Sequence, residues 1–125
     1  MIRVFHCDDS LAYRRLVRAM LATDTQIEIV GEAASHPEAL VGIAETQPDV
    51  ILLDMVVGPR DPGFPDALTA AAPGARLVIL SGHPAERADP GLRAIAIRHV
   101  RKTTAFDELA RTIHAVVAAD STNVL

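Results

Sequence analysis

The feature that most constrains the fold of this chain is a four-residue apolar run, Val50–Leu53, which follows Pro48 and Asp49 and ends on Asp54. A run this short and this rich in branched side chains is typical of a strand that is buried on both faces, as strands of parallel sheets are. Asp54 then stands at the carboxyl end of the strand, where open α/β sheets bind their ligands. Because carboxylates are rarely buried unless they are paired, Asp54 is the first candidate for chemistry.

Strand-like segments alternate with helical patterns along the rest of the chain. Short apolar runs predict strands at residues 2–7, 27–33, 50–53, 76–80 and 97–101. Helical spacing, capping residues and prolines predict helices at about residues 13–21, 36–47, 66–72, 90–96 and 106–117. The first helix is expected to present one apolar stripe, formed by Tyr13, Leu16, Val17, Met20 and Leu21. Five strands alternating with five helices predict a doubly wound α/β fold, with a parallel sheet between two helical layers.

Length and composition indicate a single domain over residues 1–120, followed by a tail or the start of a linker at residues 121–125. The net charge of -4 disfavours non-specific binding to nucleic acid or to an anionic membrane surface. The apolar runs are too short to cross a bilayer, and Cys7, the single cysteine, has no partner for an internal disulfide. We therefore expect a cytoplasmic protein without a membrane partner.

The right-handed crossovers of a doubly wound sheet bring the carboxyl ends of all its strands to one edge. That edge is expected to collect Asp8, Asp9, Asp54, Ser81 and Lys102, the last being the only lysine among twelve cationic residues. Three close carboxylates repel one another unless a cation neutralises them, and hard oxygen ligands suit Mg²⁺. A metal, an ammonium and a hydroxyl around one carboxylate can stabilise a transferring phosphoryl group, and a carboxylate nucleophile yields an acyl phosphate.

With these five residues at those positions, the chain resembles the receiver domains of two-component response regulators over essentially its whole length. The resemblance implies a flavodoxin-like sheet of strand order 2-1-3-4-5. It implies that Asp54 accepts a phosphoryl group from a histidine kinase or phosphotransfer protein, and that Lys102 pairs with the phosphoryl oxygens. It also implies an Mg²⁺ site in which Asp9 and Asp54 bind directly, Asp8 binds mainly through water, and the backbone carbonyl of Val56 completes the protein ligands.

The resemblance further implies a two-state switch, in which Ser81 turns toward the new phosphate and moves its loop. His99 stands where the family usually has a rotating Tyr or Phe, so it is either the second switch residue or a surface imidazole. His83, two residues beyond Ser81, is a candidate for contact with the phosphoryl group. Residues 57–63 depart from the usual loop after the phosphorylated strand, and Thr103 replaces the common proline, so no cis peptide is expected there.

The remaining reactive side chains have simpler interpretations. His6 is expected to be a core histidine with its hydrogen bonds satisfied, and His36 and His114 are expected on helix surfaces. Cys7 stands beside two carboxylates, so we expect its pKa to be raised and its thiol to be unreactive.

Three functions are compatible with the sequence. The first is a phosphorylatable switch, not an enzyme beyond its own phosphorylation and dephosphorylation, whose output is a protein contact or homodimerisation through residues 90–117. The second is a receiver-like interaction module that works without phosphorylation, which the altered loop and His99 favour. The third is a Mg²⁺-dependent hydrolase of the haloacid dehalogenase type. It is disfavoured because that class carries its two aspartates two residues apart, whereas Asp8 and Asp9 are adjacent. No helix-turn-helix pattern follows, so direct DNA binding by this chain is not expected.

Overall fold

The computed structural model describes residues 1–54, 61–82 and 89–122, with side chains described as far as residue 119. The elements are β1 (Ile2–Cys7), α1 (Leu11–Leu21), β2 (Ile27–Ala33), α2 (His36–Thr46), β3 (Val50–Leu53), α3 (Phe64–Ala71), β4 (Arg76–Ser81), α4 (Pro90–Ile95), β5 (Ala96–Arg101) and α5 (Phe106–Thr122). The strands form one parallel sheet of order β2-β1-β3-β4-β5. The predicted fold class and the strand order implied by the family resemblance are confirmed.

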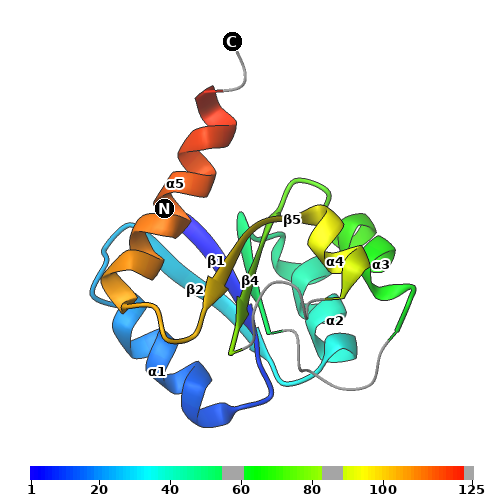
Figure 1. Ribbon diagram of the computed structural model, residues 1–125, viewed down its shortest axis with the longest axis horizontal. Coiled ribbons are helices and arrows are strands. Elements are labelled where there is room, and N and C mark those ends of the chain that lie inside the picture. The colour runs from blue at the N-terminus through cyan, green and yellow to red at the C-terminus, as the bar shows by residue number, and fades with distance from the viewer. Residues whose placement is uncertain (55–60, 83–88, 123–125) are drawn as a thin grey trace.

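The sheet lies between two layers of helices, with α1 and α5 on one face and α2, α3 and α4 on the other (Figure 1). All residues of β3, the middle strand, are buried, as the apolar run predicted. Alternation along β1 sends Val4 into the core beneath α1 and α5, and Phe5 into the core beneath α2 and α3. Helices on both faces thus explain why β3 is apolar throughout.

Side-chain caps fix where three of the helices begin. Ser10 Oγ accepts a hydrogen bond from the backbone N–H of Tyr13 at 3.1 Å, and Ser35 Oγ accepts one from the backbone N–H of Glu38 at 3.4 Å. The Asp89 carboxylate accepts a hydrogen bond from the first turn of α4 at 3.1 Å. Each cap satisfies an N–H group that has no partner inside its helix.

The packing of α1 differs from the prediction. Val17 and Leu21 are buried, but Leu16 and Met20 are 46% and 39% exposed. The buried stripe follows the four-residue spacing from Tyr13 through Val17 to Leu21, which faces the sheet and α5. Leu16 and Met20 lie on the flank of this stripe, and within the described part of the chain no element covers that flank. Of the five residues of the predicted stripe, only Val17 and Leu21 are therefore fully buried.

Helix boundaries also differ from the sequence-based ranges. α1 begins at Leu11, two residues before the expected start. α3 begins at Phe64, two residues early, because Asp61 Oδ1 accepts a hydrogen bond from the backbone N–H of Gly63 at 2.9 Å and tightens the preceding turn. α5 continues to Thr122, past the predicted end of its apolar stripe. The peptide bond after Lys102 is trans, as expected. No described helix is both long and apolar enough to cross a membrane.

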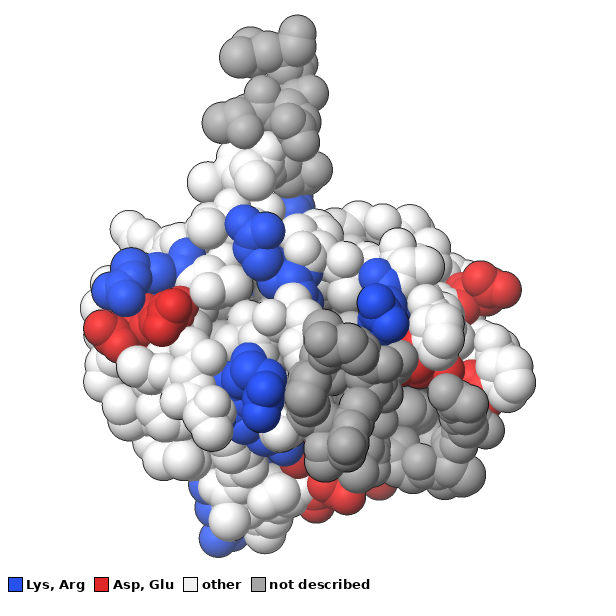
Figure 2. Space-filling model, viewed as in Figure 1, with Lys and Arg blue, Asp and Glu red and all other residues white. Residues whose placement is uncertain are grey.

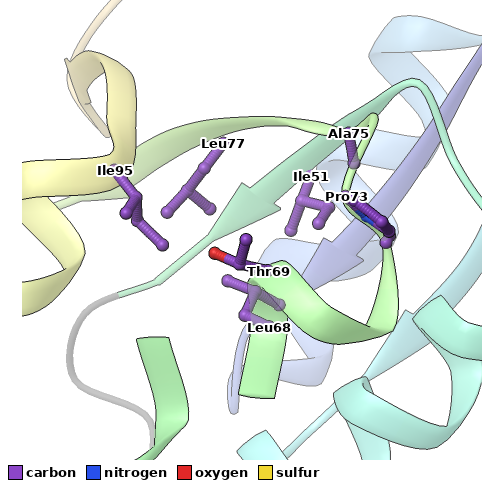
Figure 3. Close-up of a pocket in the computed structure, with 8 residues that line it drawn as sticks. Ile51, Leu68, Thr69, Pro73, Ala75, Leu77 and Ile95 are labelled. Atoms are coloured by element: carbon purple, nitrogen blue, oxygen red, sulfur yellow. The ribbon is translucent and has the colours of Figure 1, made fainter. Parts of the chain in front are cut away.

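A small pocket of about 40 Å³ lies between the two short helices α3 and α4 and the sheet (Figure 3). Leu68 and Thr69 of α3, Ile51 and Leu77 of the sheet and Ile95 of α4 point toward it. The Thr69 hydroxyl is engaged with a backbone carbonyl of its own helix at 3.1 Å. The side chains that line the pocket are mostly apolar, and we interpret this small space as a gap in packing.

The Phe5 ring occupies the space that side chains would fill at two glycines. A Cβ on Gly42, in the middle of α2, would lie 2.6 Å from Phe5 Cε2, and a Cβ on Gly31 of β2 would lie 2.7 Å from the same atom. Phe5 is 2% exposed and packed in the core, so the ring cannot move aside into solvent. Both glycines are therefore required by close packing against one aromatic ring.

We predict that Gly42→Ala lowers the free energy of unfolding by about 1–2 kcal/mol, because overpacking of the core outweighs the gain of up to ~1 kcal/mol in helix propensity. Urea denaturation measures the change. Gly74→Ala is the matched control, since no atom lies within 4 Å of its Cβ position, and it should change stability by less than about 0.5 kcal/mol. Phe5→Leu should relieve part of the cost of Gly42→Ala in the double variant. A stabilised Gly42→Ala protein would contradict this packing.

Candidate functional site

Four buried or half-buried polar residues meet where β1, β3, β4 and β5 end. Asp8, Asp54 and Ser81 are 0%, 2% and 1% exposed, and Lys102 is half-buried. Backbone hydrogen bonds continue the ladders past the strand ends, from Asp54 N–H to the Cys7 carbonyl at 2.9 Å and from Lys102 N–H to the Ser81 carbonyl at 2.8 Å. The backbone therefore holds these residues side by side in the way that the strand order requires.

Lys102 lies between two carboxylates. Its Nζ is 2.6 Å from Asp8 Oδ2 and 3.3 Å from Asp54 Oδ2. The Tyr13 ring covers the ammonium from the other side, with its centroid 4.5 Å from Nζ. Burial favours the neutral amine, but the hydrogen bonds and charges of Asp8 and Asp54 outweigh burial, so the pKa of Lys102 is raised. The side chain is thus a fixed positive charge that both aspartates share.

The start of α1 orients Asp8. Its Oδ1 accepts a hydrogen bond from the backbone N–H of Ser10 at 2.9 Å. Its backbone carbonyl accepts one from Arg14 Nη1 at 2.6 Å. Its Oδ2 is buried and lies 2.6 Å from the Lys102 ammonium. Both oxygens of this carboxylate are therefore engaged.

The three predicted acidic residues could hold a metal ion together. One carboxylate oxygen from each of Asp8, Asp9 and Asp54 lies within 4.8 Å of the other two. Ligands on opposite sides of Mg²⁺ are about 4.2 Å apart and neighbouring ligands about 3 Å apart, so closing all three carboxylates around one ion needs shifts of up to about 2 Å. Asp9 is exposed, which leaves room for the water ligands that Mg²⁺ retains. The donor set is all oxygen, as Mg²⁺ requires.

Two titratable side chains of β1 adjoin the site and are perturbed by burial. The pKa of Cys7 is raised to about 12 by burial and by the charges of Asp8 and Asp54, as expected, and the low reactivity of the thiol stays a prediction. The pKa of His6 is lowered to about 4, mainly by burial, although the nearby carboxylates favour its charged form. His6 is buried as expected, but its Nε2 has no hydrogen-bond partner among the described residues, so the expectation of a satisfied core histidine is wrong.

The other predicted residues have mixed outcomes. His99 is half-buried on β5, opposite Ile79 of β4, and its switch role stays a prediction. His36 is not a simple surface residue: its ring stacks on Phe64 with centroids 3.9 Å apart, and burial lowers its pKa. His114 is partly exposed on α5 and pairs with Asp24 at 2.8 Å. Val56, His83 and most of the altered loop at 57–63 lie outside the described residues.

Tyr13 has a part in the site that the sequence pattern did not predict. Tyr13 was assigned to the apolar stripe of α1, whereas its ring covers the Lys102 ammonium and also meets the His6 ring edge-on at 6.0 Å. The available signal was its position one turn after the Ser10 cap, on the first turn of α1 and beside the end of β1. Cation–π contacts of this kind favour the charged amine, so Tyr13 helps to hold Lys102 in place.

The chain is similar to curated proteins over most of its length. No family model matches the chain. It is 38% identical over 108 residues to protein-glutamate methylesterase/protein-glutamine glutaminase 5 of Myxococcus xanthus, and 33% identical over 114 residues to the uncharacterised transcriptional regulatory protein YhcZ of Bacillus subtilis. The matches cover 84% and 89% of this chain but 31% and 53% of the relatives. The chain therefore spans about a third and about half the length of these two proteins.

Solved structures share the fold over nearly the whole chain. A chain of the crystal structure of the P1 domain of CheA3 in complex with CheY6, from R. sphaeroides, matches with a TM-score of 0.78 and 26% identity, over 94% of this chain and 97% of that chain. The signal receiver domain of the response regulator NarL from Mycobacterium tuberculosis matches with a TM-score of 0.77 and 24% identity, over 92% and 94%. The CheX-CheY-BeF3-Mg+2 complex from Borrelia burgdorferi matches with a TM-score of 0.79 and 17% identity, over 93% and 89%.

Proposed function

This chain is a receiver domain of the response-regulator type, and on that premise we propose that Asp54 accepts a phosphoryl group in a Mg²⁺-dependent reaction. The observation that carries the proposal is the position of Lys102, whose ammonium lies within 3.3 Å of both Asp8 and Asp54. Burying two carboxylates around one lysine is costly, because ion pairing only partly offsets the loss of hydration. We would not expect a receiver-like protein that makes no chemical use of these charges to bury them together.

In the proposed reaction an Asp54 carboxylate oxygen attacks the phosphorus of the donor. The new O–P bond forms an acyl phosphate, the bond between phosphorus and the donor atom breaks, and the electron pair leaves with the donor group. Lys102 is placed to donate hydrogen bonds to the phosphoryl oxygens, since its Nζ is already 3.3 Å from Asp54 Oδ2. Ser81, buried at the end of β4, would contribute a hydroxyl to the same oxygens.

Asp8, Asp9 and Asp54 would hold the Mg²⁺, which when bound offsets the negative charge of the phosphoryl group. The Borrelia burgdorferi complex names Mg²⁺ together with BeF3 on a protein of the same fold, which supports this choice of metal. The acidic cluster supports it independently, because its oxygens are close enough to share one small ion.

The donor we propose is a histidine kinase or phosphotransfer protein, which the complex of CheY6 with the P1 domain of CheA3 supports by analogy. Phosphorylation would reposition Ser81 and His99 and so alter a surface that an output protein or domain contacts. The Myxococcus xanthus relative is named as a methylesterase, but this chain spans 31% of it, and we assign no such activity to the chain itself. We expect the protein to act in the cytoplasm.

The test is incubation of the wild-type chain with acetyl phosphate and Mg²⁺, followed by intact-mass measurement. We expect a mass gain of one phosphoryl group that EDTA prevents, and peptide mapping should place it on Asp54. Asp54→Asn is the matched control, because it preserves shape while removing the nucleophile, and it should gain no mass. A wild-type protein that stays unmodified under these conditions would favour the phosphorylation-independent interaction module, for which His99 at the switch position is the motivating observation.

A further inference from the structure

The Tyr13 ring is the third partner of the Lys102 ammonium. Its centroid lies 4.5 Å from Nζ, and the same atom lies 2.6 Å from Asp8 Oδ2 and 3.3 Å from Asp54 Oδ2. A lysine ammonium has three N–H groups, so each of them has a partner in this arrangement. The face of an aromatic ring attracts a cation, and it does so more strongly where water is partly excluded, as it is around this half-buried side chain. The ring therefore opposes movement of the ammonium away from the two carboxylates.

The Tyr13 ring is itself held in place by α1 and by the sheet. The backbone N–H of Tyr13 donates a hydrogen bond to Ser10 Oγ at 3.1 Å, which fixes the residue in the first turn of α1. The ring meets the His6 ring of β1 edge-on, and His6 is 1% exposed. The side chain also packs against the core beneath α1 and α5. Tyr13 therefore presents a fixed surface to Lys102.

The acidic cluster reaches solvent through Asp9, which is exposed. Figure 2 shows acidic atoms at the lower edge of the molecule, where Figure 1 draws the connection from β1 to α1 in dark blue. A metal ion that arrives from solvent would have to share the cluster with the Lys102 ammonium, because the ammonium already contacts one oxygen of Asp8 and one of Asp54. Like charges repel, so a firmly held ammonium weakens metal binding.

We propose that Tyr13 is a positioning residue, whose ring holds the Lys102 ammonium between Asp8 and Asp54 and thereby sets two properties of the site. The first is the affinity for Mg²⁺, which the ring lowers because it retains a competing positive charge. The second is the rate of phosphoryl transfer, which the ring raises because the ammonium is already in place to meet the phosphoryl oxygens. The second property rests on the proposed function, whereas the hold on Lys102 does not.

These two effects have opposite signs when the ring is removed, and this distinguishes positioning from a purely structural role. A Tyr13→Leu protein that keeps the apolar packing but loses the ring should bind Mg²⁺ more tightly and transfer the phosphoryl group more slowly. A site that is merely distorted would bind Mg²⁺ more weakly and also transfer more slowly. Tyr13→Phe keeps the ring and should behave as the wild type.

The first measurement is the NMR signal of the Lys102 side chain, recorded in EDTA. Lys102 is the only lysine of the chain, so labelling lysine with ¹³C at the ε carbon gives one signal without further assignment. Protons above the face of an aromatic ring are shifted upfield by the ring current. We expect an upfield ε-proton signal in the wild type and in Tyr13→Phe, and a signal near that of free lysine in Tyr13→Leu.

The second measurement is a Mg²⁺ titration of the same signal, followed by the rate of mass gain with acetyl phosphate at saturating Mg²⁺. In Tyr13→Leu we expect the dissociation constant for Mg²⁺ to fall by about threefold to tenfold, and the transfer rate to fall by a similar factor. Phe106→Leu is the matched control, because Phe106 is also a partly buried ring packed against the core beneath α1 and α5. It should change both quantities by less than about twofold.

Four results would overturn the inference. The lysine signal could be the same in the wild type and Tyr13→Leu, or Tyr13→Leu could bind Mg²⁺ no more tightly than the wild type. Tyr13→Leu could transfer the phosphoryl group as fast as the wild type at saturating Mg²⁺, or Tyr13→Phe could behave as Tyr13→Leu. A wild-type chain that gains no phosphoryl group would contradict the proposed function alone. The lysine signal and the Mg²⁺ titration need no phosphoryl transfer, and they would then decide the inference.

Discussion

Replacing Lys102 with methionine is expected to lower the free energy of unfolding of the metal-free protein by about 2–4 kcal/mol at neutral pH. The substitution keeps the length of the side chain but leaves Asp8 and Asp54, both nearly inaccessible, without their shared positive charge. Removing one partner of a buried ion pair costs ~3–5 kcal/mol, and we expect somewhat less because the Lys102 side chain is 22% exposed. Urea denaturation in the presence of EDTA measures the loss.

Magnesium should restore more stability to Lys102→Met than to the wild type, because the metal and the ammonium compete for the same carboxylate oxygens. A titration of the free energy of unfolding against Mg²⁺ concentration therefore reports on metal binding at the site as well as on the stability of the fold. Lys102→Arg should lose less stability than Lys102→Met, since it retains the charge. Arg101→Met is the neighbouring control, and its exposed side chain should contribute less than about 0.5 kcal/mol. Equal stability of Lys102→Met and wild type in EDTA would show that the ammonium does not compensate the two aspartates.

Acidification is expected to destabilise the protein by up to about 3 kcal/mol through His6 alone. Burial lowers the pKa of His6 from 6.5 to about 4. Between these values the unfolded chain binds a proton that the folded chain does not, so stability falls as the pH drops below 6.5 and the effect is complete below about pH 4. Above pH 6.5 the imidazole is neutral in both states and contributes no pH dependence.

Carboxylates titrate in the same range, so the measured quantity is the difference between wild type and His6→Phe. Denaturation curves at a series of pH values in EDTA should show a shallower loss of stability for the variant below pH 6.5. His36→Phe is the graded control: the pKa of His36 is also lowered by burial, but the ring is half-buried, so the change should have the same sign and be smaller. Parallel pH profiles for wild type and His6→Phe would contradict the assigned burial effect.

The fold was predictable because its strongest signals are local. The Val50–Leu53 run could be satisfied only by a strand covered on both faces, and alternation of strands with helices then leaves few topologies. Parallel strands with right-handed crossovers end at one edge, so the meeting of Asp8, Asp54 and Lys102 followed from their places in the chain. The buried stripe of α1 was less predictable, because the exposure of Leu16 and Met20 depends on which elements pack beside the helix.

The sequence by itself therefore determined which acidic, hydroxyl and ammonium groups come together at the strand ends. Only the tertiary structure decided how they pair and what surrounds them: that Lys102 lies closer to Asp8 than to Asp54, that Tyr13 covers its ammonium, and that His6 is buried with one nitrogen unpartnered among the described residues. The physical reason is the distance along the chain between the residues that determine each property. Strand and helix patterns depend on neighbours a few residues apart, whereas distances between side chains, burial and pKa depend on groups brought together from separate strands.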